Sequence, residues 1–187
     1  DVAKDLPATL KYLAKAGYSQ IELFGYDGKT FFGKTVKEFK AMFDANKLTA
    51  PSGHYYLPQV LYEGDMEDWK KTIDAAKIMG NKYMVIPWLD DKHRGAEDFK
   101  KLIGYINEAA VLTKAAGMKL AYHNHEFEFG KAEDGRTFYE HLLTGTDKSL
   151  VDFEMDIYWV VYAGHNPTDW FKKHPGRFHL WHVKDMD

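Results

Sequence analysis

Three segments of this chain end in clusters of histidines and carboxylates, side chains that bind metal ions or transfer protons. They cover residues 120–129, 151–156 and 178–185. Each segment begins apolar enough to form a strand and ends polar. In a parallel barrel the C-terminal ends of all strands lie on one face, so residues distant in sequence converge there. The three segments together therefore indicate an enzyme.

The spacing within each segment places its polar residues on one face, because alternate residues of a strand point the same way. Carboxylates that face a barrel interior are costly unless they are paired or bound to a metal. Carboxylates combined with histidine suit one divalent ion, Mn²⁺, Mg²⁺, Co²⁺ or Zn²⁺, which would polarise a carbonyl or an enediolate. The sets that share a face are Asp152, Glu154 and Asp156; Ala121, His123 and His125; and Leu180, His182 and Lys184.

Taken singly, these residues also have simpler roles. His123, His125 and His182 could each be a hydrogen-bonded histidine of the protein interior. Asp152 could form an ion pair near the start of its strand, and Asp156 could cap a helix that begins directly after it. The three clusters together are harder to explain by such roles than any one member is.

Four residues around these clusters are candidates for binding a sugar, which offers hydroxyl groups and apolar C–H faces. Glu22, His54 and Trp88 lie at or just after the ends of three earlier predicted strands, and His123 ends a later one. Hydrogen-bonding and aromatic side chains around a polar centre meet both requirements. Packing of Trp88 and ion pairing of Glu22 are the alternatives.

Helical patterns alternate with short apolar runs along the whole chain, which predicts βαβ units and a parallel sheet. The predicted helices cover residues 6–16, 35–46, 65–79, 96–116, 134–143 and 167–174. The predicted strands cover residues 20–24, 49–54, 83–87, 119–124, 151–156 and 178–183.

Both a doubly wound sheet and a (β/α)₈ TIM barrel fit this alternation. The Gly-x-Gly-x-x-Gly turn that favours the doubly wound fold is absent, and the polar strand ends favour the barrel. A complete barrel takes about 250 residues, whereas this chain has 187 residues, opens on a helix and closes on a strand. The prediction is one α/β domain over residues 1–187, a TIM barrel without its first and last strands.

Composition excludes several other functions. The formal net charge is −3 and the charged residues are dispersed, which argues against a nucleic-acid surface. There is no polybasic membrane patch and no apolar run near the roughly 18 residues of a membrane span. The chain contains no cysteine, which excludes disulfides, thiolate metal sites and cysteine nucleophiles. The expected compartment is the cytoplasm, with the periplasm left open, and a homo-oligomer is left open as well.

At these same residues the chain resembles the xylose isomerase-like barrel superfamily, in its sugar phosphate isomerase/epimerase branch. The resemblance covers essentially the whole chain, and the histidine-rich motif and the last segment are its most specific parts. The matching segments are residues 17–24, 52–54, 122–129, 153–159 and 175–186.

The resemblance implies one divalent metal held by Glu, Asp, His and Glu from successive strand ends. Asp156 and His182 match the second and third ligands. Where many relatives carry the first glutamate this chain has His123, so Glu128 becomes the expected carboxylate ligand, with Glu126 behind it. The fourth ligand would lie on the eighth strand. Many relatives also carry histidine where this chain has Trp159.

The implied chemistry is proton abstraction beside a metal-polarised carbonyl of a small sugar, with His125 as the base and Lys184 as an acid or oxyanion partner. It would serve isomerisation or epimerisation, or elimination from a 3-keto-glycoside. The alternatives are a non-catalytic sugar-binding barrel and a DNA-repair barrel similar to endonuclease IV. The net charge of −3 argues against the repair enzyme.

Overall fold

The computed structural model of the chain describes residues 2 and 4–185, so that Met186, in the last matching segment, lies outside it. Its centre is a five-stranded parallel sheet whose strand order follows the chain without reversal. This order confirms the predicted incomplete TIM barrel and excludes a doubly wound sheet. The strands are β3 (Ser52–His54), β4 (Tyr83–Ile86), β5 (Lys119–His123), β6 (Val151–Asp156) and β7 (Phe178–His182).

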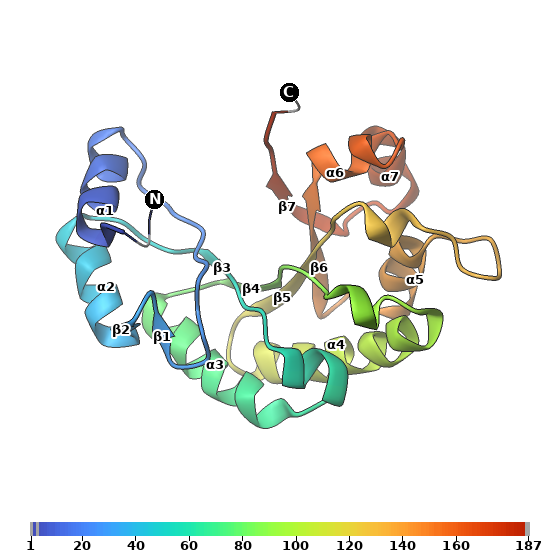
Figure 1. Cartoon of the computed structure of the whole chain (residues 1–187), viewed down its shortest axis with the longest axis horizontal. Helices are drawn as coiled ribbons and strands as arrows, with labels where there is room; N and C mark the ends of the chain where they lie inside the picture. The colour runs from blue at the N-terminus through green and yellow to red at the C-terminus, as the bar shows by residue number, and fades with distance from the viewer. Residues whose placement is uncertain (1, 3, 186–187) are drawn as a thin grey trace.

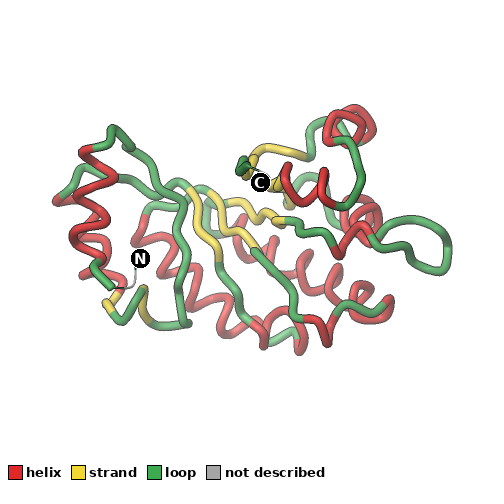
Figure 2. Tube along the Cα trace, turned by 45° about the horizontal axis from the view of Figure 1, so that its top comes forward, coloured by secondary structure: helices red, strands yellow, loops and turns green. Residues whose placement is uncertain are grey.

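The strands form a curved layer with helices along its outer side, and α1 and β7 lie at opposite ends of the arc (Figure 1). Figure 2 shows the neighbouring strands crossing above the row of helices. The α-helices are α1 (Leu6–Lys15), α2 (Val36–Ala45), α3 (Met66–Met79), α4 (Ala96–Ala115), α5 (Phe138–Gly145), α6 (Ile157–Tyr162) and α7 (Pro167–Lys173). None of the helices among the described residues is long and apolar enough to cross a membrane.

Short elements complete the fold. A small antiparallel hairpin, not predicted from the sequence, precedes α2. Thr35 and Glu38 form a capping box that starts α2, at the first residue of the helix predicted over 35–46. The short elements are β1 (Thr30–Phe31), β2 (Lys34–Thr35), the π-helical turn η1 (Gln59–Glu63) and the 3₁₀ turns η2 (Asp91–His93) and η3 (Phe127–Phe129).

Two predicted elements differ from the structure. Residues 20–24 form isolated parallel bridges instead of a strand, Gln20 with Thr49 and Leu23 with Gly53 of β3. β3 itself begins at Ser52 because Pro51 has no N–H to donate. The helix predicted at 134–143 begins at Phe138, because Gly135 adopts a left-handed turn and Thr137 supplies the N-cap.

The two faces of the sheet have different contents. The side chains of Met84, Tyr122 and Phe153 belong to the hydrophobic core, which fills the space between the sheet and the helices. The alternate residues point to the inner face, where small Ala121 and the carboxylates of β6 lie. The period-2 pattern therefore separates the residues that stabilise the fold from those available for chemistry.

A register shift between β6 and β7 brings an additional side chain to the inner face. Phe153 lies opposite Phe178, whereas Glu154 lies opposite Leu180, so His179 is the extra residue of a β-bulge. The bulge places His179 Nδ1 3.2 Å from an oxygen of Asp152 and keeps His182 opposite Asp156.

Asp152 connects four strands at the N-terminal end of the inner face. Its buried carboxylate accepts a hydrogen bond from the Tyr83 hydroxyl at 3.0 Å and lies 3.0 Å from Lys119 Nζ. His179 of β7 provides the third connection. Since both oxygens have partners, the pairing role considered for Asp152 in the sequence is the one found in the structure.

Asp152→Asn should therefore destabilise the sheet. We expect the free energy of unfolding to fall by about 2 kcal/mol, less than for a fully buried pair because Lys119 and His179 are partly exposed. Denaturant unfolding followed by circular dichroism measures this, with exposed Asp74→Asn on α3 as the control. Equal midpoints for the two variants would contradict the role assigned to Asp152.

Candidate metal and active site

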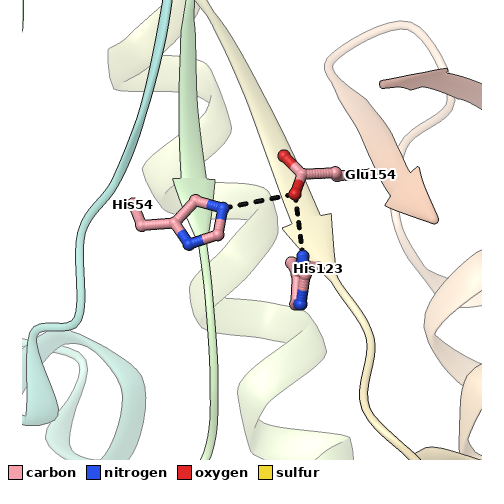
Figure 3. A group of neighbouring side chains, drawn as sticks. All are labelled: His54, His123 and Glu154. Atoms are coloured by element: carbon pink, nitrogen blue, oxygen red, sulfur yellow. Dashed lines mark hydrogen bonds and ion pairs between the residues drawn. The ribbon is translucent and has the colours of Figure 1, made fainter. Parts of the chain in front are cut away.

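Glu154 lies at the centre of a group of histidines on the inner face of the sheet. Its Oε1 atom is 2.8 Å from His123 Nδ1, 3.2 Å from His54 Nε2 and 3.7 Å from His182 Nδ1. Figure 3 shows His54 and His123 approaching the same carboxylate oxygen. In the part of the chain that the structure describes, the buried Oε2 atom has no hydrogen-bond partner.

The charges in this group depend on one another. Burial alone would raise the pKa of Glu154, but its contacts with His123, His182 and His54 lower it, so the carboxylate is ionised. Burial alone would lower the pKa of His54, but its contacts with Glu154 and Glu22 raise that pKa to about 9. The pKa of His123 is lowered, chiefly by burial, so this imidazole is neutral at pH 7.

The neutral state of His123 determines which of its nitrogens is available to a metal. An ionised carboxylate only accepts hydrogen bonds, so His123 Nδ1 carries the proton and Nε2 keeps its lone pair. Nε2 lies 3.5 Å from Asp156 Oδ2. A carboxylate that orients a histidine through the other ring nitrogen is the usual arrangement around a protein-bound metal.

Donor atoms of His123, Asp156 and His182 lie within 4.8 Å of one another at the ends of β5, β6 and β7. Two imidazoles and a carboxylate suit a divalent ion such as Mn²⁺, Co²⁺ or Zn²⁺, and Glu154 stands behind both histidines. The unpartnered oxygen of Glu154 also fits a site that holds a cation. Two further groups meet the same distance criterion: His54, His123 and Glu154, and Glu22, Glu154 and His182.

Asn124 holds the backbone of Asp156 in place. Its side-chain amide donates to the Asp156 carbonyl at 3.3 Å and accepts from the Asp156 N–H at 3.1 Å. The Tyr139 hydroxyl donates to the same Asn124 oxygen at 3.2 Å. Asp156 Oδ1 in turn accepts from Trp159 N–H and caps α6, so the N-cap predicted from the sequence is present.

Glu128 was expected to converge with Asp156 and His182, but the structure does not bring it to them; His123 lies with these two residues instead. The turn η3 directs the Glu128 carboxylate toward the outer face, where Tyr122 donates to it at 2.8 Å and His125 N–H at 2.9 Å. Glu128 belongs to none of the described groups that could hold an ion.

His125 and Lys184 lie beside Asp156 near the aromatic residues of α6. The His125 ring centroid is 5.4 Å from that of Trp159, and His125 Nδ1 and Trp159 Nε1 are buried without hydrogen-bond partners among the described residues. Burial is the largest cause that lowers the pKa of His125 to about 3, and the positive charges of Lys184 and Arg94 act in the same direction. Lys184 Nζ lies 3.0 Å from Asp156 Oδ2.

Of the remaining residues predicted to bind a sugar, Glu22 and His54 lie together and Trp88 does not. Glu22 lies 3.4 Å from His54 and joins the histidine group. Trp88 lies apart from it, half-exposed, with its ring 5.5 Å from that of Tyr56 and the Arg94 guanidinium 5.4 Å from its centroid.

Comparison with known proteins agrees with the fold. The family model described as a xylose isomerase-like TIM barrel matches residues 10–187. The chain belongs to this family. A structure of a sugar phosphate isomerase/epimerase from Parabacteroides distasonis is 33% identical, with a TM-score of 0.84 over 98% of this chain and 71% of that one. A second such structure from the same organism is 30% identical, with a TM-score of 0.84 over 97% of this chain and 73% of that one.

The curated relatives are named for dehydration instead of isomerisation or epimerisation. Inosose dehydratase of Clostridium beijerinckii is 26% identical over 90% of this chain. The chain spans 62% of the length of that enzyme. Isomerase, epimerase and dehydratase names therefore all occur among the xylose isomerase-like proteins that this chain resembles.

Sequence reasoning underrated Glu154 and did not single out Asn124 or Arg94. The alternation of Asp152, Glu154 and Asp156 places Glu154 on the inner face. This pattern alone would have been enough to predict Glu154 as a residue of the site. No spacing pattern marks Asn124, whose partners are backbone atoms of the neighbouring strand and the Tyr139 hydroxyl. The Arg94 guanidinium lies 3.6 Å from the centroid of the Phe127 ring. The two residues are far apart in sequence, so no periodic pattern predicts this contact.

The position of Glu128 predicts a pH dependence of stability. Burial raises its pKa from 4.5 to about 8, so between these values the folded state holds a proton that the unfolded state releases. Stability is therefore favoured at low pH and falls as the pH rises from about 4.5 to 8, by on the order of 4 kcal/mol.

Glu128→Gln removes the titrating group, and its amide can still accept from His125 N–H through oxygen while donating through nitrogen to the Tyr122 hydroxyl. Its unfolding free energy should lack this decline. Chemical denaturation between pH 5 and pH 8 tests it, with exposed Glu133→Gln as the matched control. A Glu128→Gln variant with the same pH profile as the wild type would rule out a neutral buried Glu128.

Proposed function

We propose that the protein is a metal-dependent enzyme that removes a proton from the carbon beside a carbonyl group of a sugar or cyclic polyol. The observation that carries this proposal is the grouping of His123, Asp156 and His182 at the ends of three adjacent parallel strands. One divalent ion held there, Mn²⁺, Mg²⁺, Co²⁺ or Zn²⁺, would supply Lewis-acid polarisation of the carbonyl oxygen.

His125 is the proposed base. Its Nδ1 has no partner among the described residues, and its lowered pKa keeps the imidazole unprotonated at neutral pH, as a base requires. The same shift weakens its basicity. Lys184 is the proposed acid or oxyanion partner. Because its Nζ atom lies beside Asp156, a proposed metal ligand, it would be near the substrate carbonyl that the metal polarises. Glu22 and His54 are proposed to bind substrate hydroxyls, and Trp88 an apolar sugar face.

Isomerases, epimerases and dehydratases of keto-sugars share this proton abstraction and differ in the step after it. In an isomerase or epimerase the proton returns to a carbon atom, whereas in a dehydratase the neighbouring hydroxyl group leaves. The fold and the relatives at 30–33% identity support the first outcome, and the inosose dehydratases at 26% identity support the second.

Proton exchange in deuterated water tests the shared step. The protein loaded with Mn²⁺ should introduce deuterium beside the carbonyl of a keto-sugar or an inosose, detected by NMR. Reprotonated product then identifies an isomerase or epimerase, and loss of water identifies a dehydratase. A barrel that binds Mn²⁺ and these sugars without any exchange would be the non-catalytic sugar-binding alternative.

Substitutions separate the metal ligands from the base. Alanine at His123, Asp156 or His182 should abolish metal binding and activity together. His125→Ala should keep the metal and lose about 10²–10⁴-fold in rate, the usual contribution of general acid–base catalysis. Metal analysis and initial rates measure both effects. Loss of metal from the His125 variant would make His125 a ligand, and a His123 variant that retains metal would return His123 to the substrate-binding set.

Trp88→Ala provides a contrasting variant. If the ring stacks on the substrate, KM should rise while kcat changes little, because packing against a non-reacting face stabilises ground state and transition state alike. A fall in kcat at unchanged KM would remove Trp88 from the sugar-binding set.

A further inference from the structure

Lys184 occupies a small cage formed by one carboxylate and two aromatic rings. Its Nζ atom is 3.0 Å from Asp156 Oδ2, 4.8 Å from the centroid of the Tyr158 ring and 4.7 Å from that of Trp159. The Asp156 side chain is fully buried, whereas that of Lys184 is 37% exposed. A buried negative charge is thus balanced by a cation that has a route to solvent.

The oxygen that Lys184 contacts is the one a metal would need. Asp156 Oδ1 is engaged by the Trp159 N–H. Oδ2 faces both Lys184 Nζ and His123 Nε2, the imidazole nitrogen assigned to the metal. An ammonium ion and a divalent ion that share one carboxylate oxygen repel each other at short range, and the repulsion is strong where water is excluded.

We propose that Lys184 is an internal counter-ion for Asp156, which a divalent cation displaces when it binds. Lys184 thereby lowers the metal affinity of the site and is released toward the substrate side once the metal is in place. The Tyr158 and Trp159 rings hold the displaced ammonium close to the site through cation–π contacts. This inference rests on the proposed metal site. It adds that Lys184 competes with the metal ion for the Asp156 carboxylate.

The opposite role for Lys184 makes the opposite prediction. If Lys184 were a permanent support that orients Asp156 for the metal, its removal would leave the carboxylate misplaced and weaken metal binding. The sign of the change in affinity therefore distinguishes a competing cation from a supporting one.

The experiment is calorimetric titration of the metal-free protein with Mn²⁺. Lys184→Met removes the charge, and Lys184→Gln retains a hydrogen-bond donor toward Asp156 without the charge. Both variants should bind Mn²⁺ about tenfold more tightly than wild type, because the repulsion between neighbouring cations is gone. Lys184→Arg, which keeps the charge, should bind no more tightly than wild type. Lys172→Gln, an exposed substitution on α7, is the control.

Thermal unfolding supplies a second measurement. Without metal, Lys184→Met leaves the Asp156 charge uncompensated, so its Tm should lie below that of wild type. Mn²⁺ should then raise the Tm of this variant by more than it raises that of wild type, since at a given free Mn²⁺ concentration an ion that binds more tightly stabilises the folded state more. If the Met variant does not fold, the Gln variant answers the same question.

The outcomes separate this inference from the proposed function. Wild-type affinity or weaker binding in folded Lys184→Met and Lys184→Gln would overturn the counter-ion role while leaving the metal site intact. Absence of Mn²⁺ binding in wild type and in both variants would overturn the metal site, and the counter-ion role with it. Tighter binding in both neutral variants, unchanged in Lys172→Gln, would support the proposal.

Discussion

The arrangement of this chain depends on three carboxylates that alternate along β6 and point into the barrel interior. Asp152, Glu154 and Asp156 are each no more than 1% exposed, so each charge requires compensation from a neighbouring strand. β4, β5 and β7 provide the partners of Asp152, and histidines of β3, β5 and β7 surround Glu154. The inward-facing polar residues of the neighbouring strands therefore lie where they can pair with the carboxylates of β6.

The groups that balance the three carboxylates differ along β6. This difference distinguishes a carboxylate that stabilises the sheet from those that could take part in chemistry. Asp152 is balanced by groups that hold both of its oxygens. Glu154 has one oxygen shared among histidines and one without a partner among the described residues. Asp156 is balanced by a partly exposed lysine. Capacity to accept an ion or a substrate thus increases toward the C-terminal end of the sheet, where active sites of parallel barrels lie.

Sequence patterns predicted the parts of this design that depend on local periodicity. The parallel sheet follows from the alternation of helical and strand patterns, and the shared inner face of β6 follows from a spacing of two residues. Patterns failed where a turn changes direction: η3 carries Glu128 away from the site although it lies within the most polar motif. They also failed for Asn124, whose function is to hold backbone atoms on another strand.

Asp156 joins the candidate metal site to the aromatic residues of α6 beside it. The same carboxylate that lies near His123 and Lys184 caps α6, so the first turn of α6 cannot move independently of the site. That turn carries Trp159, whose ring lies against His125. A change in the charge balance at Asp156, whether by a metal ion or by loss of Lys184, therefore acts on the helix cap and on the surroundings of His125 together. Ion binding and the position of the proposed base are consequently coupled through a single side chain.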